Sequence, residues 1–217
     1  DEVATQLEVF TRRATERLIR HAFARARERL AARGQGSRDF HCANRGRAAA
    51  QVCLITKRNA QPFWGDLYTE VFAEVAAEFP EIGVHHELVD AACMKFVQCP
   101  WTFDVVVASN LHGDILTDLA AVLSGGLGLA PSCNINPDSR AMPALFEPTH
   151  GSAPDIVGQG LANPAAMLLT TALMLDWVGC AQAAERLRLA VAKDLATTAG
   201  QQRTCRDVTA GVIAALH

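Results

Sequence analysis

The chain has 217 residues, 50% of them hydrophobic and 20% charged, which allows a buried core and excludes a globally disordered protein. Its formal net charge of -3 gives no electrostatic basis for binding nucleic acid or an anionic membrane. The local run of arginines between residues 12 and 47 is better explained as a solvated helix face and loop. No apolar stretch is long enough to cross a bilayer. The seven cysteines fit neither a zinc site nor a Cys-x-x-Cys pair, so we expect a reducing, cytoplasmic compartment.

The hydrophobic pattern predicts alternating helices and strands in the first half of the chain. An amphipathic helix is expected over residues 8–32, followed by an irregular Gly- and Arg-rich loop over 33–50. The elements predicted after this loop are a strand at 51–56, a helix at 66–79, a strand at 84–89, a helix at 91–97, a strand at 104–108 and a helix at 113–124. This alternation is typical of an α/β fold with a mainly parallel sheet.

The second half of the chain is predicted to be helical after a long loop. The Gly-rich run SGGLGLAPS interrupts the pattern, and we expect a boundary between two lobes after residue 124. Residues 133–164 are predicted to be loop, followed by helices at 164–178, 181–198 and 208–216. Pro164 suits the first turn of its helix, where a missing N–H costs nothing.

Three aspartates could bind a divalent cation together. Asp114 and Asp118 stand four residues apart and therefore face the same side of a helix, and Asp90 ends the predicted strand in LVD. Carboxylate oxygens are hard ligands that suit Mg²⁺ or Mn²⁺. Asp114 could equally be a capping residue at the start of its helix. That explanation suits Asp118 less well, because Asp118 lies inside an apolar helix.

Other polar residues allow both a functional and a structural interpretation. Lys57 ends a predicted strand and could act as a base if partial burial lowered its pKa, but a solvated charge explains it as well. Asn110 could line a cleft or form a turn after the strand. His112 and His150 are possible ligands or bases, although a lone histidine is more often a structural residue.

A turn-rich loop, HGSAPD at residues 150–155, could wrap a nucleotide. Gly151 lets the backbone approach a ligand closely. Asp155 could accept hydrogen bonds from both ribose hydroxyls of an adenosine and would repel a 2′-phosphate, which favours NAD over NADP. Asn163 could reach an adenine edge or form a turn before Pro164. The sequence has no Gly-x-Gly-x-x-Gly fingerprint after a strand.

These strings resemble the β-decarboxylating dehydrogenase family, whose members include isopropylmalate, isocitrate, homoisocitrate, D-malate and tartrate dehydrogenases. NLHGDILTDLA resembles the family's metal-site motif, and FEPTHGSAPDIVGQGLANP resembles its adenosine-binding loop. TKRN resembles its catalytic Lys-x-Asn, and VFTRRATERLIRHAF resembles one of its helices. The resemblance runs from residue 2 to about residue 198. Within the family, the NINPD run and the GQG are most similar to the tartrate and D-malate branch, and isopropylmalate dehydrogenase is second.

The resemblance implies an isopropylmalate dehydrogenase-like, two-lobed α/β fold that is incomplete. Residues 1–124 would belong to the metal and dimer lobe, and residues 125–217 to the adenosine-binding lobe. The implied reaction is the NAD-dependent oxidation, with decarboxylation, of a 2-hydroxy dicarboxylic acid such as tartrate or D-malate. 3-Isopropylmalate is the alternative substrate.

The resemblance also implies a role for individual residues. Asp90, Asp114 and Asp118 would hold Mg²⁺ or Mn²⁺, and Lys57 and Asp90 would be the catalytic residues. The implied cofactor-binding residues are Asn59, His150, Gly151, Ser152, Ala153, Asp155, Ile156 and Asn163. Because Lys57 and Asp90 would serve the neighbouring subunit's site, we expect a homodimer with C₂ symmetry, and neither nucleic acid nor membrane as a partner.

The chain also departs from the family pattern. The family's N-terminal part, with an arginine cluster and a catalytic tyrosine, has no counterpart, and Tyr68 lies on a predicted helix elsewhere. Arg58, His112 and Thr149 replace a small residue, a Phe and a Val. The TCRDVTAG segment lacks the Gly-rich loop expected before the last helix. We therefore keep a catalytically inactive C-terminal fragment as an alternative to an active enzyme.

Overall fold

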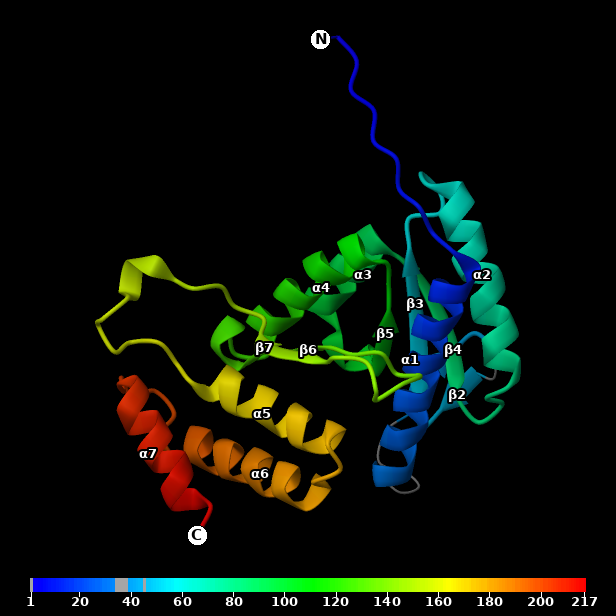
Figure 1. Ribbon diagram of the computed structural model, residues 1–217. Helices are drawn as coiled ribbons and strands as arrows, with labels where there is room; N and C mark the ends of the chain where they lie inside the picture. Colours follow the sequence, from blue (N-terminus) through cyan, green and yellow to red (C-terminus); the bar gives the residue numbers. More distant parts are fainter. Residues whose placement is uncertain (1, 34–38, 45) are drawn as a thin grey trace. The chain divides into compact units, whose positions relative to one another are not determined.

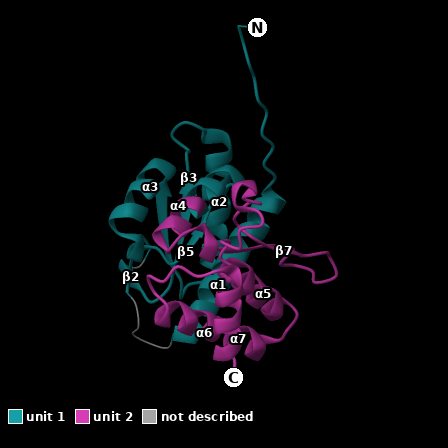
Figure 2. Ribbon diagram, turned by 90° about the vertical axis from the view of Figure 1, so that its left-hand side faces the viewer, with its two compact units in different colours: residues 1–117 teal, residues 118–217 magenta. Residues whose placement is uncertain are grey.

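The computed structural model of the chain describes residues 2–33, 39–44 and 46–217. It divides into two compact units, unit 1 over Asp1–Thr117 and unit 2 over Asp118–His217 (Figure 2). The division falls inside helix α4 (Asn110–Leu123), a few residues before the lobe boundary that we predicted after residue 124. The assignment of a metal lobe and an adenosine lobe to the two halves stays a prediction.

Unit 1 is built around a three-stranded parallel sheet with the strand order β4-β3-β5 (Figure 1). Its elements in chain order are α1 (Arg12–Arg33), β1 (Phe40–Cys42), β2 (Gly46–Ala48), β3 (Gln51–Thr56), α2 (Pro62–Ala77), β4 (Gly83–Leu88), α3 (Val89–Gln98), a 3₁₀ turn (Pro100–Thr102), β5 (Val105–Val107) and the first part of α4. The predicted α/β class with a parallel sheet is confirmed.

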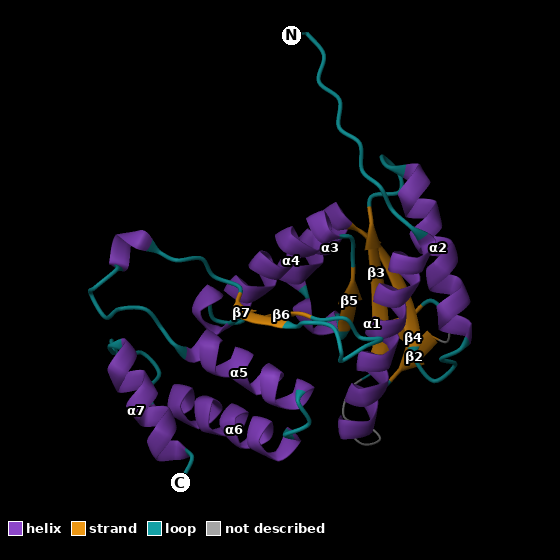
Figure 3. Ribbon diagram, viewed as in Figure 1, coloured by secondary structure: helices purple, strands orange, loops and turns teal. Residues whose placement is uncertain are grey.

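The core of unit 1 lies between the sheet and two helices. All six residues of the central strand β3, QVCLIT, are buried, as is typical of the middle strand of a parallel sheet. Helices α1 and α2 pack against each other and against β3 (Figure 3). Phe23 of α1 joins them, with its ring centroid 5.3 Å from that of Phe72 and 5.2 Å from that of Phe79.

A buried carboxylate fixes the start of β5 to the end of α1. The side chain of Asp104 is fully buried and accepts hydrogen bonds from Arg33 at 2.5 and 2.9 Å and from Arg29 at 3.0 Å. The backbone N–H of Gln51 donates to the same carboxylate at 3.3 Å. Burial alone would raise the pKa of Asp104, but the arginine hydrogen bonds lower it overall.

Unit 2 combines a strand pair with three packed helices. Its elements in chain order are a 3₁₀ turn (Leu127–Leu129), β6 (Pro131–Asn134), β7 (Leu145–Pro148), a 3₁₀ turn (Pro154–Ile156), α5 (Ala165–Trp177), α6 (Ala181–Thr197) and α7 (Cys205–Ala215). Strands β6 and β7 are antiparallel, and α5 packs on both of them and on α6. Alanines at the centre of this packing, Ala165, Ala172 and Ala184, are fully buried and let the helix backbones approach closely.

The structure corrects several predicted boundaries. The first helix begins at Arg12 rather than at residue 8, and residues 2–11 form no helix or strand. Part of the predicted loop at 33–50 forms the antiparallel pair β1–β2, while residues 34–38 and 45 lie outside the described residues. The predicted loop at 133–164 contains β7 and the second half of β6. The last helix begins at Cys205 rather than at residue 208, because Thr204 and Asp207 form a capping box.

The structure also bears on the state of the cysteines and on the question of membrane-spanning helices. None of the seven cysteines, all of which are described, forms a disulfide bond. Among the helices in the described ranges, none is both long and apolar enough to span a bilayer.

Candidate functional site

Lys57 and Asp90 meet at one edge of the parallel sheet. Strands β3 and β4 are aligned so that Thr56 stands opposite Leu88, and both strands end at that edge. Lys57 directly follows β3, and Asp90 lies in the first turn of α3, which begins right after β4. The Lys57 Nζ therefore lies 2.8 Å from the Asp90 Oδ1. Asp90 is thus a helix residue, not the strand end that we predicted.

The electrostatics of this pair favour the ionised form of Asp90. The hydrogen bond from Lys57, together with backbone N–H groups at the start of α3, lowers the pKa of the Asp90 carboxyl. The Lys57 side chain is 28% exposed and the Asp90 side chain 65% exposed, so both remain accessible to a ligand. A partly buried lysine and an ionised carboxylate in contact could bind a hydroxy acid or share a proton with it.

The backbone that carries Lys57 is fixed by a buried hydroxyl. The Thr56 Oγ1 lies 2.8 Å from the Nε2 of His86 on β4 and accepts the N–H of Arg58 at 3.4 Å. Thr56 is fully buried, and burial lowers the pKa of His86. Neither Thr56 nor His86 was a predicted site residue, since their contact depends on the register of two parallel strands. Asn59 follows in an exposed turn closed by the hydrogen bond from the Ala60 N–H to the Lys57 carbonyl.

Asp114 and Asp118 lie one turn apart on α4, and both are exposed. The Asn110 Nδ2 donates to the Asp114 Oδ2 at 3.3 Å, so Asn110 orients this carboxylate. In the described part of the chain, no three His, Cys, Asp or Glu side chains are grouped so that they could hold a metal ion. The predicted metal site over Asp90, Asp114 and Asp118 stays a prediction.

His112 belongs to the core of unit 1. Its ring lies 5.4 Å from that of Trp64, which in turn stacks on Phe10 at 5.2 Å. Burial lowers the pKa of His112, which keeps the imidazole neutral near pH 7. The structure thus favours the structural interpretation of His112.

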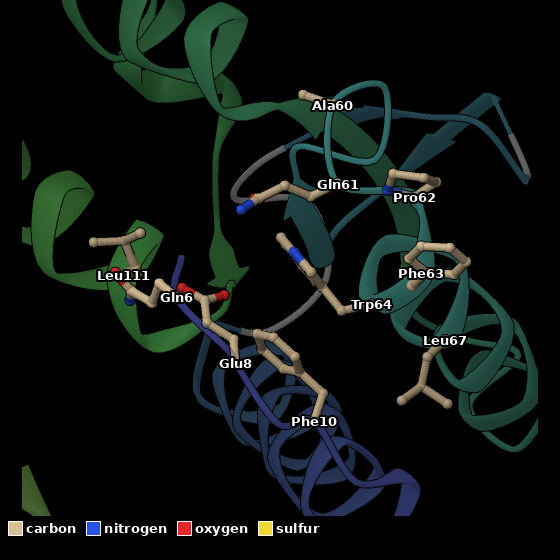
Figure 4. A pocket seen from close by; sticks show the side chains of 10 residues that line it. All are labelled: Gln6, Glu8, Phe10, Ala60, Gln61, Pro62, Phe63, Trp64, Leu67 and Leu111. Carbon is tan, nitrogen blue, oxygen red and sulfur yellow. The ribbon is translucent and has the colours of Figure 1, made fainter. Parts of the chain in front are cut away.

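A pocket of about 700 Å³ opens at the start of α2 (Figure 4). Apolar side chains line most of it, including Phe10, Trp64 and Leu111, and Glu8 lies at one side. Gln61 and Ala60 also line it, so the pocket adjoins the turn that carries Lys57 and Asn59. The indole nitrogen of Trp64 is buried and has no hydrogen-bond partner among the described residues.

The predicted adenosine loop is an exposed, turn-rich segment of unit 2. Gly151, Ser152, Ala153 and Asp155 are all exposed. Ala153 has a φ of 44°, the only positive φ of a residue other than glycine in the described ranges. This left-handed residue leads into the 3₁₀ turn Pro154–Ile156, which carries the Asp155 and Ile156 side chains.

Local hydrogen bonds hold the ends of this loop. The His150 Nδ1 lies 3.0 Å from the carbonyl oxygen of Gly151. The Gln159 Nε2 donates to the Asp155 carbonyl at 2.8 Å, a contact that the i,i+4 spacing in DIVGQ could have indicated. The Asn163 Oδ1 accepts the N–H of Ala165 at 3.0 Å, two residues further on, and so forms an Asx turn just before α5. This is the turn role of Asn163, and its predicted adenine contact stays a prediction.

Known proteins match almost the whole chain. The family model described as isocitrate/isopropylmalate dehydrogenase matches residues 1–212. The 3-isopropylmalate dehydrogenase of Thermobifida fusca (strain YX) is 46% identical over 194 residues, which are 89% of this chain and 49% of that protein. The 3-isopropylmalate dehydrogenase of Nocardia farcinica (strain IFM 10152) is 44% identical over 203 residues, which are 94% of this chain and 55% of that protein.

The fold is also similar to that of a solved structure of an isocitrate dehydrogenase. The crystal structure of isocitrate dehydrogenase from Methylococcus capsulatus superposes with a TM-score of 0.83 at 36% identity, covering 99% of this chain and 59% of that one. The chain spans about half the length of the curated relatives it matches. On the family match and on these relatives, the chain belongs to the isocitrate/isopropylmalate dehydrogenase family.

Proposed function

We propose that this chain carries the lysine, the aspartates and the adenosine loop of an NAD- and metal-dependent dehydrogenase. The enzyme would oxidise and decarboxylate a 2-hydroxy dicarboxylic acid. The observation that carries the proposal is the contact between Lys57 and Asp90 at the edge of the sheet, in a chain of this family.

3-Isopropylmalate is the first candidate substrate, because the similar curated relatives named above are 3-isopropylmalate dehydrogenases. Tartrate or D-malate, which the NINPD run and the GQG favoured, is the second. The names of the relatives thus support the alternative substrate better than the one that we put first from the sequence.

The chemistry of the three carboxylates suits a divalent cation. Asp114 and Asp118 offer hard oxygen ligands from one exposed helix face, and Asp90 stays ionised because its pKa is lowered. When bound, Mg²⁺ or Mn²⁺ would supply Lewis-acid stabilisation of the negative charge that develops during decarboxylation. Lys57 would hold the proton that leaves the substrate hydroxyl as hydride passes to NAD⁺. Asp155 would accept hydrogen bonds from both ribose hydroxyls of the adenosine, and Asn59 would lie near the nicotinamide.

Exposed apolar side chains on the helices that carry the aspartates support a homodimer with a shared site. Met94 and Val97 of α3 are 51% and 62% exposed and continue the helix face of Asp90 at spacings of four and seven residues. Leu111, Ile115 and Val122 on α4 are also exposed and lie on one face with Asp118. A second copy that covered these apolar stripes would bring its own carboxylates close to those of the first.

The proposal is tested by following NAD⁺ reduction by the purified chain with Mn²⁺ and 3-isopropylmalate, D-malate or tartrate. We expect metal-dependent turnover that is fastest with 3-isopropylmalate, slower with NADP⁺, and reduced at least 100-fold in Lys57→Met. Lys193→Met, which alters a lysine on α6, is the control and should keep full activity. A folded sample that binds NAD⁺ without turnover would favour the inactive-fragment alternative, and a folded sample that neither binds nor turns over would refute the proposal for this chain.

A further inference from the structure

We propose that the start of α7 is the tether that positions the adenosine loop, with the backbone N–H of Cys205 as the contact and Arg203 as the positioning side chain. The functional meaning of this tether rests on the proposed function, because it assumes that residues 150–163 bind the adenosine of NAD. The physical claim, that α7 holds the loop in place, does not depend on that assumption.

The tether is one hydrogen bond between distant parts of unit 2. The N–H of Cys205 donates to the carbonyl oxygen of Gly160 at 2.8 Å. The other hydrogen bonds that the structure records for residues 150–162 join residues within the loop itself. Those residues are also mostly exposed, so little packing restrains them. The bond to Cys205 is therefore the contact that fixes the loop against the helices of unit 2.

The tether reaches the residue proposed to contact the ribose. Gly160 follows Gln159, whose side-chain amide donates to the Asp155 carbonyl at 2.8 Å. Gly158 and Gly160 have φ values of 79° and 69°, which glycine adopts without strain, and so the chain can turn on both sides of Gln159. A displacement of Gly160 would accordingly move Gln159 and the turn that holds Asp155.

The start of α7 is well anchored on α6. The Arg203 guanidinium donates to the Asp194 Oδ2 at 2.7 Å and to the Thr198 Oγ1 at 2.9 Å, both near the end of α6. It also donates to the Asp207 carbonyl in the first turn of α7, at 2.5 Å. The Asp194 side chain is only 4% exposed, so this pair is shielded from water. Thr204 and Asp207 add a capping box, which together with Arg203 leaves little freedom at Cys205.

A fixed loop would bind a nucleotide more tightly than a free one. An exposed segment that must be ordered on binding costs conformational entropy, and this cost lowers the affinity. Because the tether orders the loop beforehand, it reduces that cost. Arg203 and Cys205 thus act through the loop and would not touch the nucleotide.

The variant Cys205→Pro removes the tether while preserving the helix. Cys205 is the first residue of α7, a position where proline is favoured and where the N–H has no partner within the helix. Thr204 has a φ of -76° and a ψ of 162°, the extended conformation that suits a residue before proline. Cys205→Ala is the matched control, because it removes the thiol and keeps the N–H.

The measurements are amide hydrogen exchange over the full chain and the Kd of NAD⁺ by calorimetry. We expect Cys205→Pro to speed exchange at residues 150–163 and to raise the Kd of NAD⁺, each about five- to tenfold, as the loss of one hydrogen bond predicts. Cys205→Ala should change neither. Arg203→Lys, which cannot span the same three acceptors, is the second variant and should speed loop exchange in the same direction.

Unchanged loop exchange in both Cys205→Pro and Arg203→Lys would overturn the proposal. So would faster loop exchange that occurs only together with faster exchange throughout α6 and α7, because that result would indicate general unfolding of unit 2. If the wild-type chain does not bind NAD⁺, the proposed function fails for this chain, while the exchange data still decide whether α7 holds the loop.

Discussion

Asp104 shows how one residue connects distant parts of unit 1. Its fully buried carboxylate accepts hydrogen bonds from two arginines of α1 and from the Gln51 backbone at the start of β3. A buried charge that lost these donors would be strongly destabilising, because water could not replace them. Asp104 itself begins the strand β5 region, so the same contacts fix the edge of the sheet.

We expect Asp104→Asn to lower the free energy of unfolding by about 2 kcal/mol near neutral pH. The pKa of Asp104 is lowered in the folded chain, so its contribution is complete above the unfolded value of about 4 and is lost as the pH falls through the folded value. The difference in the free energy of unfolding between Asp104→Asn and the wild type should therefore shrink below about pH 4. Urea unfolding at a series of pH values measures it.

The control for this prediction is Asp39→Asn. Asp39 is 52% exposed and pairs with Arg47, which is 70% exposed, so its removal should cost less than about 0.5 kcal/mol. Equal losses in the two variants, or a loss for Asp104→Asn that does not depend on pH, would contradict the role given to the buried carboxylate.

Among the elements, the alternation from β3 to α4 is the part that the sequence predicts well. Apolar runs such as QVCLIT have the length of a strand, and the helices between them are amphipathic. The pairs β1–β2 and β6–β7 could not be predicted, because each strand has only three or four residues and most are partly exposed. Such strands show neither an apolar run nor a clear alternation.

The motifs of the candidate site could be predicted from the sequence, but the contacts between its side chains could not. The strings around Lys57, Asp114 and Asp155 point to the family, and strand ends point to one edge of the sheet. The contact of His86 with Thr56 depends on the register of β3 and β4, which a local pattern does not contain. The link from Cys205 to Gly160 likewise depends on how α7 packs.

The close packing of helix α7 on helix α6 predicts the effect of a substitution at Gly211. A Cβ atom added at Gly211 of α7 would lie 2.0 Å from the Asp194 Oδ1 and 2.6 Å from an Arg203 nitrogen. We expect Gly211→Ala to lower the free energy of unfolding by about 1–3 kcal/mol, because the overpacked pair must shift. Urea unfolding followed by circular dichroism measures the change.

Gly113→Ala is the matched helical control. A Cβ atom at Gly113 of α4 meets nothing within 4 Å, so alanine should be neutral or stabilise by up to about 1 kcal/mol. If Gly211→Ala proved as stable as the wild type, the close packing of α7 on the Asp194–Arg203 pair would be refuted.

For the whole molecule, the exposed apolar stripe on α3 predicts self-association. We expect the purified chain to sediment as a dimer and Val97→Glu to shift it towards monomer, because a charge would have to be buried in the interface. Leu189→Glu on α6 is the control, since Leu189 is 61% exposed, close to the 62% of Val97, and lies outside the stripe. A wild-type monomer at all concentrations, or equal behaviour of the two variants, would contradict the shared-site proposal.

The connectivity of the parallel sheet has a consequence for the order of folding. Strand β3 must pair with β4 and β5, and both pairings close long crossovers through helices, which are slow to form. The helices of unit 2 are instead neighbours in sequence and make mostly local contacts, α5 with α6 and α6 with α7. The helices of unit 2, although synthesised after the sheet, would then acquire their structure within a shorter time than the sheet. The rate of reaching the native state would accordingly be set by closure of the β3 crossovers.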